Sequence, residues 1–122
     1  MTDIKLGSHS FVERNLLNEK NDCTVRALSE ALGIPYLEAY GMMIGYGRKA
    51  KKRFNCRPMY SELGTAMPRP AMTVERYVSL IAHSGRWIIE IRGHVFAVIE
   101  GEIKDMYPSY NLSRHVVQAW RF

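Results

Sequence analysis

The first half of the chain has the hydrophobic spacing of helices. Apolar residues recur every three or four positions from Val25 to Leu32, which predicts a helix that begins near Asp22 or Cys23. Asp22 is the expected N-cap, because its side chain can accept a hydrogen bond from an unpaired backbone N–H, and Gly33 ends the helix. Further helices are predicted over residues 36–44, 61–67 (a single turn) and 74–83.

The second half changes to the alternating pattern of strands. Apolar and polar residues alternate from Arg86 to Arg92, and a β-branched and aromatic run follows from His94 to Ile99. Glu100-Gly101 predicts a tight turn into the next strand. The predicted strands are 86–92, 94–99, 102–106 and 114–122. Helices followed by consecutive antiparallel strands indicate an α+β fold, and 122 residues fit one domain, 1–122.

Composition narrows the setting in which the protein works. Hydrophobic residues make up 47% of the chain and charged residues 24%, as in an ordinary globular domain. No apolar run is long enough to span a membrane, and the first residues lack the apolar stretch of a secretory signal. With two cysteines and no export signal, we expect free thiols and a cytoplasmic protein that does not bind membranes.

The positive charge is concentrated in one segment. The formal net charge is +5, but six of the 17 basic residues lie within residues 48–57, which contain no acid. These six are Arg48, Lys49, Lys51, Lys52, Arg53 and Arg57. An exposed loop of this kind can bind an acidic partner or nucleic-acid phosphates with strong salt dependence. It can equally be a solvated loop that raises solubility, or clamp an acidic substrate.

Three residues combine into a candidate catalytic group. Cys23 is expected at a helix N-terminus, where unpaired N–H groups and the helix dipole favour thiolate over thiol. His94 opens a strand after a glycine, and the turn at Glu100-Gly101 folds Asp105 back towards it. A carboxylate beside an imidazole fixes its tautomer and stabilises its charged form. The order thiol, imidazole, carboxylate therefore predicts a Cys23–His94–Asp105 triad.

The segments around these residues resemble a known family. Residues 21–28 with Gly33-Ile34-Pro35-Tyr36, and residues 93–101 with Asp105, resemble small papain-like cysteine proteases of phages and bacteria. They are also similar to the peptidase domains of bacteriocin-processing transporters. The resemblance covers about a third of the chain, and residues 41–84 match nothing in it. It implies N-terminal helices whose Cys-bearing helix packs on a C-terminal antiparallel sheet, in a bacterial or phage-infected cell.

One position departs from the family pattern. Papain-like enzymes usually place a glutamine before the cysteine, where its side chain donates to the oxyanion. This chain has amides only at Asn15, Asn18 and Asn21 there, and Asn18 is our candidate donor, with the Cys23 backbone N–H as the second. Losing one oxyanion donor commonly lowers the rate about a hundredfold or more, so this departure bears on turnover more than on fold.

Two interpretations of function follow. The first is a cysteine hydrolase, a peptidase or isopeptidase acting on a peptide or protein substrate through a thioester; a deamidase or acyltransferase would use the same triad. The second is a non-catalytic papain-like scaffold that binds a host protein or nucleic acid through residues 48–57. No cofactor is expected. A metal site is not expected either, because the spacing of Cys23, Cys56, His83 and His94 matches no zinc motif. The sequence leaves the oligomeric state open.

Overall fold

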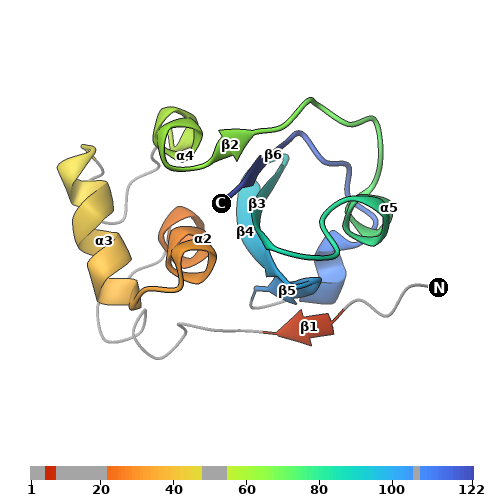
Figure 1. Cartoon of the computed structure of the whole chain (residues 1–122), viewed down its shortest axis with the longest axis horizontal. Helices are drawn as coiled ribbons and strands as arrows, with labels where there is room; N and C mark the ends of the chain where they lie inside the picture. The colour runs from red at the N-terminus through yellow and green to blue at the C-terminus, as the bar shows by residue number, and fades with distance from the viewer. Residues whose placement is uncertain (1–4, 8–21, 48–54, 106–107) are drawn as a thin grey trace.

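A mixed β-sheet forms the centre of the molecule, and helices lie against both of its faces (Figure 1). This computed structural model describes residues 22–47, 55–105 and 108–122, together with the backbone of residues 5–7. Its helices are α2 (Cys23–Leu32), α3 (Tyr36–Gly45), α4 (Arg57–Leu63), α5 (Val74–Leu80) and the 3-10 helix η1 (Pro108–Asn111). Its strands are β1 (Lys5–Gly7), β2 (Thr65–Ala66), β3 (Arg86–Ile91), β4 (His94–Ile99), β5 (Glu102–Lys104) and β6 (Gln118–Arg121).

The sheet confirms the α+β class. The order of its described strands is β1-β5-β4-β3-β6-β2. Strand β1 is parallel to β5, and the other neighbouring pairs are antiparallel. In the middle of this order, β3, β4 and β5 are neighbours because they follow one another along the chain and are joined by short turns.

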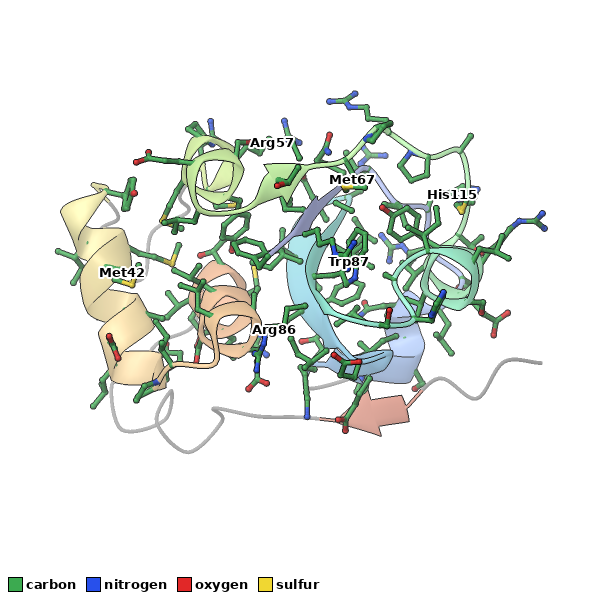
Figure 2. All side chains as sticks on the ribbon, in the orientation of Figure 1. Met42, Arg57, Met67, Arg86, Trp87 and His115 are labelled. Atoms are coloured by element: carbon green, nitrogen blue, oxygen red, sulfur yellow. The ribbon has the colours of Figure 1, made fainter. Side chains whose placement is uncertain are left out.

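Alternation along the strands divides the core into two layers. Ile88 and Val95 face α2, which lies between the sheet and α3. Trp87, Ile89 and Phe96 face the opposite side, where Trp87 packs edge-on against Tyr77 of α5 (Figure 2). Each fully buried large apolar side chain contributes about 1.5–3 kcal/mol. The sheet is therefore stabilised from both faces, which explains why its central strands are almost continuously apolar.

The turn between β4 and β5 fixes the position of Asp105. Glu100 and Gly101 both have positive φ, 50° and 79°, as a type I′ hairpin turn requires. Ile99 pairs with Glu102 and Ala97 with Lys104, so the next residue, Asp105, returns towards the start of β4. The prediction that this hairpin brings His94 and Asp105 together is confirmed by their 2.6 Å hydrogen bond.

Several predicted elements differ in extent. In place of the single turn predicted at 61–67, the structure has the end of α4 and then β2. Helix α4 begins earlier, at Arg57, with Pro58 in its first turn. The helix predicted over 74–83 begins with the Thr73 side chain as its N-cap, but it ends at Leu80. The strand predicted over 114–122 is ordered as a strand only from Gln118 to Arg121. Strand β1 was not predicted, because three residues are too few for a periodic signal.

Asp22 does not cap α2 as predicted. It occupies the N-cap position, but its side chain makes no capping hydrogen bond. Its carboxylate instead accepts from Arg26 Nε (3.3 Å) and from the Tyr36 hydroxyl (2.9 Å). The buried guanidinium and phenol outcompete the helix amides for this carboxylate, which redirects Asp22 from the helix end to the interior. No helix in the described ranges is long and apolar enough to cross a membrane.

Candidate active site

Cys23 is the first residue of α2, where the helix meets the start of β4. Its side chain is half-buried and free of any disulfide. The Val95 backbone hydrogen-bonds to it, and the His94 side chain does so as well. A thiol at this place also faces the positive end of the helix dipole. Every described neighbour of the sulfur that bears on its ionisation, other than burial itself, favours the thiolate.

His94 links the thiol to a carboxylate. Its Nε2 donates to Asp105 Oδ2 over 2.6 Å, and the ring also hydrogen-bonds to Cys23. With Nε2 held by Asp105, Nδ1 is the ring nitrogen left for the sulfur. The imidazole stacks on Phe96 with ring centroids 6.0 Å apart, which restrains its orientation. The geometry is therefore thiol, imidazole and carboxylate in one chain of contacts.

Asp105 is held from three sides. Its Oδ2 also accepts from Asn111 Nδ2 at 2.8 Å, and its Oδ1 accepts from Arg26 Nη1 at 3.2 Å. Asp105, Arg26 and Asn111 are all buried, with relative exposures of 4–7%. A carboxylate so enclosed keeps its charge because charged and amide donors replace the water it has lost. Arg26 also pairs with Asp22, so α2 is tied to the residue that follows β5.

The electrostatics of the site favour a thiolate–imidazolium pair. Burial alone would raise the pKa of Cys23, but the hydrogen bond and the charge of His94 outweigh it and lower that pKa. Burial would likewise lower the pKa of His94, yet the Asp105 hydrogen bond, with the Cys23 contact, raises it to about 9. The two shifts reinforce each other, since each charged form stabilises the other, and Asp105 further stabilises the imidazolium.

Cys56 provides a contrast within the same chain. It is buried beneath α4, and burial together with the negative charge of Glu90 raises its pKa to about 12. The raised pKa disfavours the thiolate of Cys56, whereas Cys23 has the His94 imidazole beside it, which favours the charged form.

The remaining predicted site residues have different outcomes. Asn18, the predicted oxyanion donor, lies outside the described residues and stays a prediction. The same holds for the basic residues Arg48, Lys49, Lys51, Lys52 and Arg53. Arg57 belongs to α4 rather than to a loop, and its guanidinium makes two hydrogen bonds to Glu90, at 2.6 and 3.0 Å. An external anion at Arg57 would have to compete with that carboxylate.

Sequence reasoning missed the residues that support Asp105. Arg26 lies one turn after Cys23 on α2, but 79 positions separate it from the carboxylate it binds. Asn111 lies only six positions beyond Asp105, in η1. Arg26 lies off the apolar stripe of Val25, Leu28 and Leu32, so only its burial, which the sequence does not show, requires an internal acidic partner.

The described residues contain no group of three or more His, Cys, Asp or Glu side chains that could hold a metal ion. A thiol hydrogen-bonded to an imidazole can act as a nucleophile with its base. No protein-family model, curated protein or solved structure matches the chain.

Proposed function

We propose that the chain is a papain-like cysteine hydrolase, a peptidase or isopeptidase that cleaves a peptide or protein substrate. The observation that carries this proposal is the continuous contact from Cys23 through His94 to Asp105, with 2.6 Å between His94 Nε2 and Asp105 Oδ2. A buried thiol, an imidazole and a carboxylate can form such a chain in a merely structural core. A thiol whose pKa is lowered despite burial is what acyl transfer needs.

The reaction follows from these contacts. The Cys23 thiolate attacks the carbonyl carbon of the scissile amide and forms a C–S bond, while the oxygen takes the negative charge. The Cys23 backbone N–H, with Asn18 as the predicted second donor, would stabilise that oxyanion. The protonated His94 gives its proton to the amide nitrogen as the C–N bond breaks. Water, deprotonated by His94, then hydrolyses the thioester and restores the thiolate.

Asp105 acts on His94 and not on the substrate. Accepting from Nε2 keeps Nδ1 directed at the sulfur and stabilises the imidazolium. Arg26 and Asn111 hold the carboxylate in the orientation that makes this bond. They are positioning residues in the proposed reaction.

The test is the rate of iodoacetamide alkylation of Cys23 against pH, read by peptide mass. We expect Cys23 to be alkylated at neutral pH much faster than Cys56, the control thiol whose pKa is raised to about 12. In His94→Ala, the hydrogen bond and the charge that contribute most to lowering the Cys23 pKa are lost, so its alkylation at pH 7 should slow by about tenfold or more.

A contrary result is equally clear. If folded Cys23 reacts no faster than an ordinary thiol, and His94→Ala reacts as the wild type does, the hydrolase proposal is wrong. Circular dichroism of both proteins confirms that the comparison is made between folded chains.

A further inference from the structure

A pocket lies beside the triad on the side of His94. Its volume is about 690 Å³, and it opens to solvent. That size is typical of sites for small ligands or a few substrate residues. The residues lining it are Arg26, Ile91, Arg92, His94, Asp105, Pro108, Ser109, Tyr110, Asn111 and Arg114. Cys23 is not among them, so the pocket adjoins the base and its carboxylate rather than the nucleophile.

The pocket carries an excess of positive charge. Three arginines and one aspartate line it, which leaves two formal positive charges, or three when His94 is protonated. Arg26 and Asp105 already neutralise each other in the interior. Arg92 and Arg114 are exposed, and neither side chain makes an ion pair or hydrogen bond with another residue in the described part of the chain. Two guanidinium groups are thus available at the rim.

The walls between these charges are apolar. Ile91, Pro108 and Tyr110 contribute hydrocarbon and aromatic surface, and Tyr110 is 74% exposed. An exposed aromatic residue beside unpaired guanidinium groups suits a ligand with a hydrophobic body and an anionic end. A carboxylate matches the planar fork of arginine, which can donate two parallel hydrogen bonds to it.

The position of His94 in the pocket wall indicates which part of a substrate would enter the pocket. In the proposed reaction the acyl part stays on Cys23, whereas His94 donates its proton to the departing amine. The pocket contains His94 and excludes Cys23, so it adjoins the departing amine. Resting on the proposed function, we infer that the enzyme selects substrates whose leaving group carries a carboxylate, held by Arg92 and Arg114.

Binding of leaving-group dipeptides tests this without requiring turnover. The probes are Ala-Glu amide, with a side-chain carboxylate, Ala-Ala free acid, with a terminal carboxylate, and Ala-Gln amide, which is uncharged. Calorimetric titrations use wild type and the Arg92→Gln and Arg114→Gln variants, with Arg76→Gln as the control. Arg76 is an exposed arginine of α5 that does not line the pocket.

We expect one or both acidic dipeptides to bind, and each pocket substitution to weaken them about five- to tenfold, as losing a charged hydrogen bond does. Arg76→Gln should leave their affinity unchanged. Whichever acidic dipeptide binds more tightly identifies the source of the carboxylate. Equal binding of all three probes, no binding by any, or no effect of Arg92→Gln and Arg114→Gln would overturn the inference.

The proposed function can fail separately. It depends on Cys23 alkylation, which requires neither arginine. Reactive Cys23 with no preference for acidic dipeptides would refute only the pocket inference. An inert Cys23 with Arg92-dependent and Arg114-dependent binding would refute the hydrolase, and the leaving-group role with it, and would leave a pocket that binds carboxylates.

Discussion

His94 owes its properties to the two groups that flank it. On one side, His94 Nε2–H donates a hydrogen bond to Asp105, and on the other side Cys23 supplies a thiolate. Burial works against the charged ring, but these partners outweigh it and raise the pKa to about 9. At neutral pH the imidazole therefore carries the proton that the proposed acyl transfer would deliver to the leaving amine. This is the opposite of an ordinary histidine, whose pKa is near 6.5 and which is mostly neutral at pH 7.

NMR titration of the His94 ring should reveal this shift directly. We expect a midpoint near pH 9 in the wild type. In Cys23→Ser the midpoint should fall, because the thiolate no longer stabilises the imidazolium, and in Asp105→Asn it should fall further, since the larger hydrogen-bond contribution is lost.

The same shift gives stability a definite pH dependence. The folded-state pKa of His94 is raised, so its contribution to the free energy of unfolding is complete below about pH 6.5 and is lost as the pH rises through about 9. The thiolate of Cys23 has the opposite dependence; Cys23→Ser removes it and also lowers the pH at which the His94 contribution is lost, because the thiolate is one of the causes of the raised His94 pKa. If the His94 midpoint in the wild type lies near the ordinary histidine value of about 6.5, the ion pair does not form.

Helix α2 supplies more than the nucleophile. Asp22, Cys23 and Arg26 lie within one turn at its start, and Arg26 reaches Asp105 beyond β5. At the other end of the helix, Arg86 of β3 donates to the Glu30 carbonyl at 3.0 Å (Figure 2). A side chain from outside the helix thus satisfies one of its final carbonyls. Both ends of α2 are fixed to the sheet layer, which holds Cys23 against His94.

Substitution of Arg26 should uncouple α2 from Asp105. Arg26→Met keeps a long apolar stem but leaves Asp22 and Asp105 without their shared guanidinium. Removing one partner from a buried ion pair commonly costs about 3–5 kcal/mol, and we expect urea denaturation to show a loss of that size. Arg76→Met, at an exposed position, should change the free energy of unfolding by less than about 0.5 kcal/mol. A loss below 1 kcal/mol in Arg26→Met would contradict a stabilising role for these pairs.

Local patterns predicted the elements that local physics determines. The helix from Cys23 to Leu32 and the hairpin about Glu100-Gly101 follow from apolar spacing and turn chemistry, so both could be predicted from sequence. The meeting of His94 and Asp105 followed from that hairpin. The start of α4 could not be predicted, because its apolar residues Met59 and Tyr60 are buried in a core cluster that includes the distant Trp120.

Long-range partner choice was also beyond the sequence. Asp22 could bind its own helix amides or Arg26, and only the assembled interior favours the second. The same applies to Arg26 and Asp105, whose pairing requires α2 to lie across the sheet. A buried charge without a partner is costly, so burial makes such ion pairs necessary. Burial in turn depends on the whole fold.

The candidate site exists only in the assembled molecule. Cys23 comes from the helical layer, whereas His94 and Asp105 come from the sheet and the chain beyond it. The sheet is in turn supported from its other face, where Ile89 is fully buried with Trp87 near α5. The lowered pKa of Cys23 therefore depends on packing at a distance from the sulfur.

This dependence predicts that Cys23 loses its reactivity only when the whole fold is lost. During urea titration at pH 7, the ratio of Cys23 to Cys56 alkylation should fall towards one in the same transition that circular dichroism detects. Ile89→Ala opens a cavity on the face away from α2 and should lower stability by about 2–5 kcal/mol, shifting both transitions together. Leu80→Ala, at a side chain that is 58% exposed in the same layer, should shift neither appreciably. Loss of Cys23 reactivity at lower urea than the spectroscopic change would mean that the α2 contact with β4 opens locally, and the site would then be independent of the distant core.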